Sequence, residues 1–177
     1  MKKVKSSTHP SSPMLIGLIS DTHDHLKMIE RAVAFFNDRK VTIVLHAGDV
    51  ISPFTAKKFK DCGSRLILVY GNNDGDRSNL QRVFSEIGAQ FYWPAAILEL
   101  DGKKTLMLHG EDLKLVEEIA NRNIFDLIVS GHTHEASVKR IGGTLWVNPG
   151  EACGYLTAKS TVGIYDSLRH EAEIIEI

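Results

Sequence analysis

The first half of the chain alternates short apolar runs with longer stretches of mixed polarity. Apolar runs that stop abruptly at polar residues are typical of strands buried on both faces of a sheet. The expected strands are 15–19, 42–45 and 65–70. Residues 26–39 place apolar side chains at helical spacing, and helices are also expected over 53–60 and 79–87. Strands and helices that alternate in this way predict parallel strands joined by crossover helices.

The second half predicts more strands and fewer helices. Asp101-Gly102 and Gly142-Gly143 each suit the tight turn of a hairpin. The expected elements are strands over 95–100, 104–109, 126–129, 135–141, 144–148, 160–165 and 171–177 and a helix over 112–121. Many strands, with helices concentrated early, predict two packed sheets covered by helices, which is a mixed α/β sandwich.

Length and charge narrow the function classes. A chain of 177 residues suits one domain, expected over 14–177. A formal net charge of -1 gives no electrostatic reason to expect nucleic acid or a membrane surface as a specific partner. No apolar run approaches the roughly 18 residues that span a bilayer. Residues 1–13 begin with lysines but lack an apolar segment, so we expect a disordered N-terminal extension or an expression leader.

The two cysteines add little chemistry. Cys62 and Cys153 lie far apart and match neither a disulfide framework nor a thiolate metal site. Free thiols are typical of a reducing compartment, so cytoplasm is the expected location.

Residues that can bind metal ions follow five of the expected strands. Ligands of open α/β sheets bind beyond the carboxyl ends of the strands. Side chains two residues apart in extended chain point to one side, so Asp21 and His23 can act together, as can His132 and His134. Neighbouring glycines allow tight turns and close approach to an anion. Each short motif alone is common in loops, and their ordered co-occurrence is the informative feature.

This ordered series resembles the calcineurin-like metallophosphoesterases. The matching motifs are Asp21-x-His23, Gly48-Asp49, Gly71-Asn72-x-Asp74, His109-Gly110 and Gly131-His132-x-His134. The short chain and Asn148-Pro149-Gly150-Glu151 resemble the small prokaryotic phosphodiesterase branch of that family, over about residues 15–177. The resemblance implies a four-layer αββα sandwich with two mixed β-sheets, and small homo-oligomers.

The resemblance also implies two metal ions. Its implied ligands are Asp21, His23, Asp49 and His134 for one ion and Asp49, Asn72, His109 and His132 for the other, with Asp49 as the bridge. Oxygen and imidazole ligands favour Mn, Ni, Fe, Co or Zn over Mg or Ca, and Mn is our first expectation. Two such ions can clamp phosphoryl oxygens and generate a bridging hydroxide for in-line attack on phosphorus. The expected catalytic residues are Asp49, Asn72, Asn73 and His109.

Asn73 departs from the family pattern. Members with strong monoesterase activity usually have histidine at this position, where it can protonate the leaving group. A carboxamide is no general acid, although it can hydrogen-bond a leaving oxygen. We therefore expect a phosphodiesterase that acts on small diesters or on esters with acidic leaving groups.

Two alternatives remain at the level of sequence. The first is a phosphomonoesterase or nucleotidase, which Asn73 disfavours. The second is a non-catalytic scaffold like the binding subunit of the eukaryotic retromer coat, in which the same fold has eroded metal ligands. Competent residues at every implied ligand position disfavour the scaffold.

Overall fold

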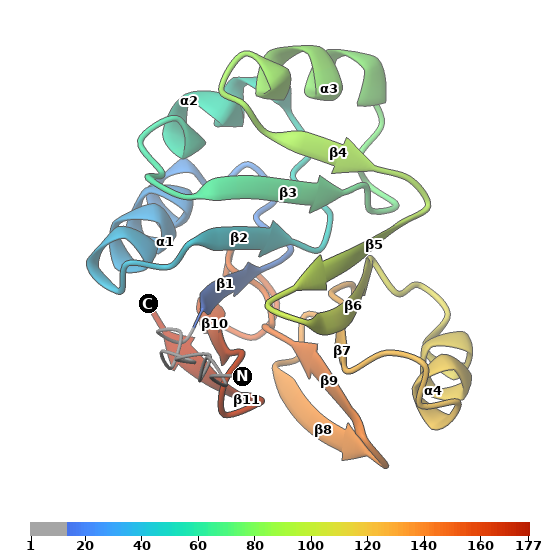
Figure 1. Cartoon of the computed structure of the whole chain (residues 1–177). Coiled ribbons are helices and arrows are strands. Elements are labelled where there is room, and N and C mark those ends of the chain that lie inside the picture. Colours follow the sequence, from blue (N-terminus) through green and yellow to red (C-terminus); the bar gives the residue numbers. More distant parts are fainter. Residues whose placement is uncertain (1–13) are drawn as a thin grey trace, which may run out of the picture.

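The computed structural model describes residues 14–177, and its strands form two facing sheets (Figure 1). The extension expected over residues 1–13 lies outside the described residues. The first sheet has the order β11-β10-β1-β2-β3-β4 within this part of the chain. Its strands are β1 (Leu15–Ile19), β2 (Ile43–His46), β3 (Arg65–Val69), β4 (Gln90–Tyr92), β10 (Thr161–Asp166) and β11 (Glu171–Glu176). Strands β1 to β4 run parallel, and β10 and β11 pair antiparallel, so the sheet is mixed.

The second sheet, over the same described residues, has the order β5-β6-β7-β9-β8. Its strands are β5 (Ala95–Leu100), β6 (Lys103–Leu108), β7 (Leu127–Val129), β8 (Ser137–Ile141) and β9 (Thr144–Asn148). Strands β6, β7 and β9 are parallel neighbours, whereas β5 and β8 are antiparallel strands at the two edges. Both expected hairpins, β5–β6 and β8–β9, are present.

The helices lie outside the two sheets (Figure 1). Their bounds are α1 (Leu26–Asp38), the 3₁₀ turn η1 (Pro53–Thr55), α2 (Ala56–Phe59), α3 (Arg77–Ser85) and α4 (Leu113–Asn121). Helices α1, α2 and α3 cover the first sheet, and α4 lies beside the second. None of the helices within residues 14–177 is long and apolar enough to cross a membrane.

In the described part of the chain, three apolar clusters correspond to the three interfaces between these layers. One cluster packs the helices on the first sheet and includes Phe36 and Phe84. The central cluster fills the space between the sheets and includes Leu18 and Met107. The third joins α4 to the second sheet through residues such as Val116. The predicted αββα sandwich of two mixed sheets is therefore confirmed.

Two details differ from the sequence prediction. β4 was not expected, because it has only three residues and pairs with β3 alone at the sheet edge. The helix expected over 53–60 is divided, since a 3₁₀ turn that begins at Pro53 precedes the single turn of α2.

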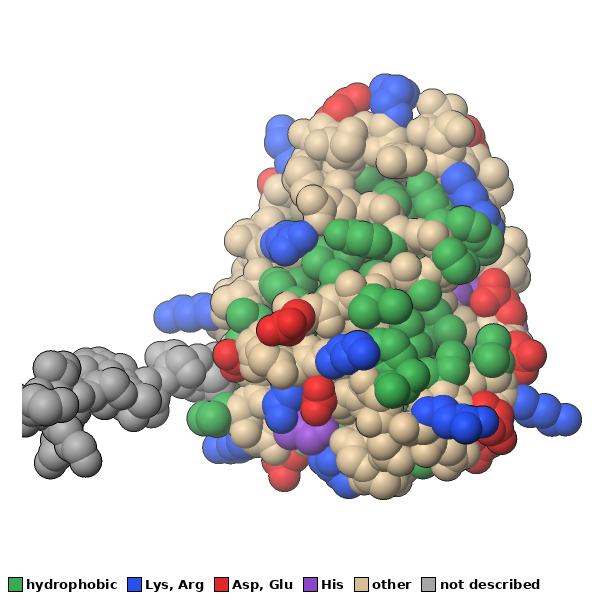
Figure 2. All heavy atoms as spheres, turned by 45° about the vertical axis from the view of Figure 1, so that its right-hand side comes forward, with side chains coloured by type: hydrophobic (Ala, Val, Ile, Leu, Met, Phe, Trp, Pro, Cys, Tyr) green, Lys and Arg blue, Asp and Glu red, His purple; other side chains and the backbone are tan. Residues whose placement is uncertain are grey.

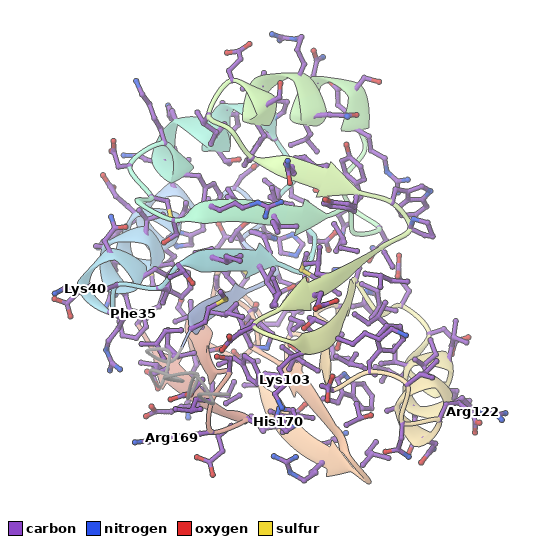
Figure 3. The ribbon with its side chains drawn as sticks, in the orientation of Figure 1. Phe35, Lys40, Lys103, Arg122, Arg169 and His170 are labelled. Carbon is purple, nitrogen blue, oxygen red and sulfur yellow. The ribbon has the colours of Figure 1, made fainter. Side chains whose placement is uncertain are left out.

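The C-terminal hairpin also contacts the second sheet. Tyr165 and His170 share a hydrogen bond of 2.8 Å between the phenol oxygen and Nδ1. Arg140 of β8 donates to the carbonyl oxygen of His170, which Figure 3 labels near the lower edge of the molecule. This contact joins the edges of the two sheets at the end remote from α3.

The packing of α1 on β1 depends on the absence of a side chain at Gly17. A Cβ built there would lie 2.8 Å from ring atoms of Phe36, which is 1% exposed. We expect Gly17→Ala to lower the free energy of unfolding by about 1–3 kcal/mol, because the ring has little room to move. In a Phe36→Leu background, Gly17→Ala should lower the free energy of unfolding by a smaller amount. Urea unfolding measures both effects.

Gly75→Ala is the matched control, because a Cβ at Gly75 meets no atom of the described residues within 4 Å. It should change the unfolding free energy by at most about 0.5 kcal/mol. Equal stability of Gly17→Ala and the unmodified protein would contradict this account of the packing.

Candidate metal centre

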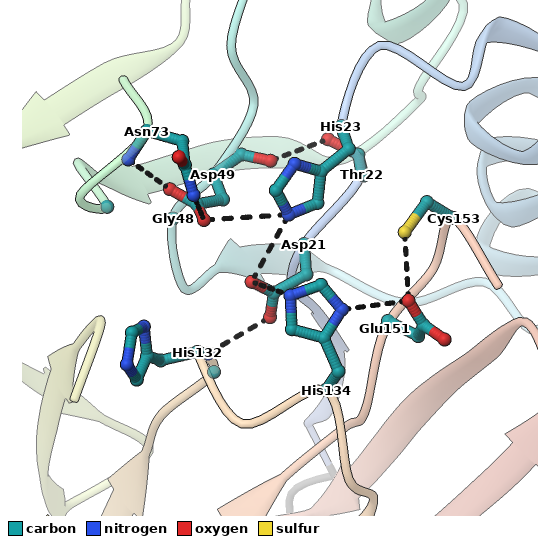
Figure 4. A network of polar contacts seen from close by, with 12 residues as sticks. Asp21, Thr22, His23, Gly48, Asp49, Asn73, His132, His134, Glu151 and Cys153 are labelled. Carbon is teal, nitrogen blue, oxygen red and sulfur yellow. Dashed lines mark hydrogen bonds and ion pairs between the residues drawn. The ribbon is translucent and has the colours of Figure 1, made fainter. Parts of the chain in front are cut away.

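The predicted site residues come together where parallel strands of both sheets end. Backbone hydrogen bonds tie the loops to one another: Asp21 donates to Gly48, and His23 donates to the carbonyl of Asp49. Gly131 donates to the carbonyl of His109, which connects the loops after β6 and β7. The convergence follows from the topology, because parallel neighbours place their carboxyl ends at the same edge. Figure 4 shows the side chains of Asp21, His23, Asp49 and His134 directed at one another.

Asp21, His23 and His134 form one cluster of metal-competent atoms. Oδ1 of Asp21 lies 3.8 Å from Nε2 of His23 and 3.6 Å from Nε2 of His134. Asp21 is completely buried, and neither its Oδ1 nor Nε2 of His23 has a hydrogen-bond partner among the described residues. Buried polar atoms are normally satisfied, so these facing atoms fit a shared cation.

Asp49 joins this cluster to a second one. Its Oδ2 lies 3.5 Å from Nε2 of His23 and 3.4 Å from Nε2 of His109. Asp49 is 1% exposed, and burial alone would raise its pKa. Hydrogen bonds from His109 and Asn73 outweigh that effect and hold the pKa well below its ordinary value. The carboxylate is thus charged and central, as a bridging ligand must be.

Asn72 completes the second cluster. Its Oδ1 lies 3.1 Å from Nε2 of His109 and 2.9 Å from Nδ1 of His132. Nδ1 of His109 pairs with the carbonyl oxygen of Ala47 at 2.8 Å, which fixes the ring and directs Nε2 toward Asn72 and Asp49. Burial lowers the pKa of His109, but Asp49 and Asp21 raise it to about 9 in total. A cation could replace the proton that these carboxylates attract.

The two clusters fit the metal ions that the resemblance implies. All seven predicted ligands lie in them, and their donor atoms are the oxygen and imidazole groups that transition-metal ions accept. One cluster holds facing atoms that have no hydrogen-bond partner within residues 14–177, and the other is arranged around a carboxamide oxygen. The predicted ligand set is therefore geometrically compatible with a pair of ions, although the assignment stays a prediction.

Asn73 lies differently from its predicted role. Its backbone N–H donates to Oδ1 of Asp49, and its Nδ2 donates to Oδ2 at 2.7 Å (Figure 4). The side chain is exposed, so it also borders the solvent from which a substrate would arrive. Contact with a leaving group stays a prediction, and the contact present in the structure is with the Asp49 carboxylate.

Asp74 holds the loops in place. Its carboxylate accepts the backbone N–H groups of Asp49, Ile51 and Gly71 at 3.0, 2.7 and 2.7 Å. Burial raises the pKa of Asp74, and these three donors oppose the increase. Asp74 therefore fixes the loop after β3 to the loop after β2.

Several site residues adopt backbone conformations that L-amino acids rarely use. Asp21, His23, Asp49, His132 and His134 all have positive φ, between 39° and 69°. Such residues cost of order 1–3 kcal/mol each and persist where surrounding contacts enforce them. Their concentration in the converging loops indicates that contacts between the loops outweigh the local backbone preference.

Glycines are needed where two loops touch. Gly48 has a φ of 102°, and a Cβ there would lie 2.6 Å from Nδ1 of His109. A Cβ at Gly71 would meet the carboxylate of Asp49. These glycines allow close approach between the loops themselves, and not only to an anion.

Glu151 contacts a predicted ligand, although the motif Asn148-Pro149-Gly150-Glu151 gave no sign of this role. The side chain is completely buried, and its Oε2 lies 2.8 Å from Nδ1 of His134. Backbone N–H groups of Tyr155, Leu156 and Thr157 also donate to this carboxylate. These bonds lower the pKa of Glu151 to about 2, although burial opposes the change. Glu151 therefore orients the His134 ring so that Nε2 faces Asp21.

His134, Glu151 and Cys153 form a further cluster of potential ligands. The thiol of Cys153 donates to Oε2 of Glu151 at 3.1 Å. Burial and the Glu151 carboxylate raise the pKa of this thiol to about 12, so it stays protonated at neutral pH. The carboxylate already accepts several donors, and the cluster is better explained as support for His134 than as a metal site.

His46 supports the site from beneath. It is completely buried, and burial lowers its pKa to about 4, so the ring is neutral. Nδ1 accepts the N–H of Gly48, which places the proton on Nε2, where it can be donated to Thr22 Oγ1 at 3.1 Å. His46 is therefore a neutral packing residue beneath the predicted ligands.

Comparisons with known proteins decide the family. The family model described as a calcineurin-like phosphoesterase superfamily domain matches residues 14–169. The chain belongs to this family. It is 39% identical over 159 residues to a phosphodiesterase of Methanocaldococcus jannaschii, covering 89% of this chain and 96% of that protein. The predictions of a metallophosphoesterase and of an enzyme are thereby confirmed.

Solved structures agree with the fold. The structure of an archaeal phosphodiesterase superposes with a TM-score of 0.87 at 37% identity, covering 93% of this chain and all of that chain. Vacuolar protein sorting 29 of Cryptosporidium parvum has a TM-score of 0.64 at 20% identity, covering 93% of this chain and 97% of that chain. At this identity the second match supports only the shared fold.

The role of Glu151 can be tested through metal affinity. Glu151→Gln removes the charge that orients and polarises His134, so we expect the affinity for Mn²⁺ to fall by about 10- to 100-fold. Isothermal titration calorimetry on the metal-depleted protein measures this directly.

Glu135→Gln is the matched control, because Glu135 is exposed and follows His134 immediately in the chain. It removes the same charge near the site without touching the His134 ring nitrogen. Equal metal affinities of the two variants would overturn the positioning role of Glu151.

Proposed function

We propose that the protein is a two-metal-dependent phosphodiesterase that acts on small-molecule phosphodiesters. The observation that carries the proposal is the position of Asp49 between two clusters of ligand atoms. When bound, two divalent ions would clamp the phosphoryl oxygens and acidify a water molecule for in-line attack on phosphorus. The 39% identity to a protein named as a phosphodiesterase supports the choice of diesters.

The residues of the chain provide orientation and charge. The seven ligands carry two carboxylates, Asp21 and Asp49, so two divalent ions would leave the site positively charged. Such a site attracts the single negative charge of a phosphodiester. Hydrogen bonds from Nδ1 of His109 and His134 hold both rings with Nε2 directed inward. These contacts exist before any substrate arrives, which is the condition for preorganised electrostatic catalysis.

The ion is proposed to be Mn²⁺, with Ni, Fe, Co and Zn as the other candidates. Four imidazoles among the ligands favour these ions over Mg and Ca, which prefer shells of oxygen atoms. The remaining proposals are a cytoplasmic location, small homo-oligomers and no specific nucleic-acid partner.

Two observations favour diesters over the alternatives. Asn73 cannot donate a proton to a poor leaving group, which disfavours a monoesterase or nucleotidase. Intact ligands in converging, preorganised loops disfavour a non-catalytic scaffold.

Removal of a ligand tests the site assignment. Asn72→Ala and His132→Ala should each lower kcat/KM for bis(p-nitrophenyl) phosphate by at least about 100-fold, because each removes a ligand of the second ion. The assay uses Mn²⁺-supplemented protein, with Leu168→Ala on the exposed β10–β11 turn as control. Unchanged activity in both ligand variants would overturn the assignment, and lack of any turnover or metal binding in the unmodified protein would favour the scaffold.

Substitution of Asn73 tests the leaving-group argument. Asn73→His introduces a general acid, so we expect kcat for alkyl leaving groups to rise by at least about tenfold while p-nitrophenyl esters change little. The dependence of log kcat on the leaving-group pKa, measured over a series of diesters, should become flatter. Asn73→Ala is the control, since it removes the contact with Asp49 without adding an acid. No gain on poor leaving groups would contradict the argument.

A further inference from the structure

A hollow of about 230 Å³ opens beside the metal centre and shares a wall with it. The shared wall is His109, a predicted ligand of the second ion. The apolar part of the lining is Trp93, Pro94, Leu108 and Leu115. These residues come from the β4–β5 connection, the end of β6 and helix α4. Figure 2 turns this side of the molecule forward and shows hydrophobic side chains gathered on it.

Trp93 is exposed and yet held in place. Its side chain is 56% exposed, while the guanidinium carbon of Arg77 lies 3.8 Å from the ring centroid. Nε of Arg77 donates to the carbonyl oxygen of Asp74, whose carboxylate accepts the N–H of Asp49. A short series of contacts therefore connects the indole to the bridging ligand. An exposed aromatic ring that the active-site loop itself positions is suited to stacking against a bound group.

The size and charge of the hollow limit what it can hold. Pockets for drug-sized ligands measure roughly 300–1,000 Å³, so a hollow of 230 Å³ suits a single ring system. Glu111 and Asp112 also line it, and their negative charge disfavours an anionic group. A phosphate at the metal centre could extend an ester substituent past His109 into this space.

We propose that the hollow binds one ester group of the diester substrate, namely a flat, uncharged aromatic ring such as a nucleobase or an aryl group. Trp93 supplies the stacking surface, and Leu115 supplies a second wall. The proposal rests on the proposed phosphodiesterase function, because the phosphate must occupy the neighbouring site. The proposed substrates are therefore diesters that carry an aromatic substituent.

Non-hydrolysable phosphonates test the hollow without turnover. Phenylphosphonate and methylphosphonate differ only in the ring, and calorimetry on the Mn²⁺-loaded protein gives both affinities. Stacking on an aromatic side chain should make phenylphosphonate bind about tenfold more tightly. Trp93→Ala and Leu115→Ala should reduce this ratio to below about threefold, whereas Trp93→Phe keeps most of it.

Leu168→Ala is the control, because Leu168 is 66% exposed on a distant turn and should leave the ratio unchanged. Leu115 is 54% exposed, so its truncation tests the wall even if Trp93→Ala folds poorly. A ratio near one in the unmodified protein would overturn the proposal. Leu115→Ala gives a second way to overturn it. If this variant changes the mass of the protein in solution, measured by light scattering, but leaves the ratio of the two phosphonate affinities unchanged, the hollow contacts a second copy of the chain instead of a substrate.

The outcomes distinguish failure of the aromatic-ring proposal from failure of the proposed phosphodiesterase function. If diesters are not hydrolysed but the ratio depends on Trp93, the phosphodiesterase assignment fails and the aromatic site stands. If diesters are hydrolysed and both phosphonates bind equally in every variant, the phosphodiesterase function stands and the aromatic site is wrong.

The acidic residues Glu111 and Asp112 allow one further test. The ligand 4-carboxyphenylphosphonate should bind more weakly than phenylphosphonate, and Glu111→Gln should reduce the difference between the two affinities.

Discussion

The structure depends on the burial of two carboxylates, Asp21 and Asp49, at the junction of its two sheets. Isolated buried charges are costly, so such groups require donors or cations around them. For Asp49 the donors are Asn73 and His109, and for Asp21 one oxygen accepts the N–H of His132 while the other has no donor among the described residues. The converging imidazoles and the strained loop backbones are arranged around this requirement.

Much of the fold could be predicted from the sequence because the central strands are short apolar runs with polar ends. The same feature predicted which candidate ligands come together, since parallel strands place the residues that follow them at one edge of a sheet. Pairs such as His132 and His134 were visible because both members lie in one short motif. Contacts between segments that are distant in the sequence could not be predicted, because the periodicity of apolar residues carries no information about them.

Glu151 shows why the remainder could not be predicted. Its partners are the ring of His134, 17 positions earlier, and backbone N–H groups that any residue type would provide. No residue pattern identifies such a contact. Similarly, β4 is a strand only because β3 offers an unpaired edge, and three residues carry too little periodicity to reveal it. The direction of the Asn73 side chain toward Asp49 likewise depends on the loop after β2.

The Glu151 carboxylate has a consequence for how the site responds to its surroundings. One of its oxygens contacts His134, and both accept N–H groups from residues 155–157, so the predicted ligand His134 and the exposed loop share a single anion. Thermodynamic linkage is reciprocal. If ion binding at His134 strengthens this network, then the ion orders the loop of Tyr155 and Leu156, and any contact that orders the loop retains the ion more tightly. Under that condition, metal retention and loop order would be a single equilibrium observed at two places.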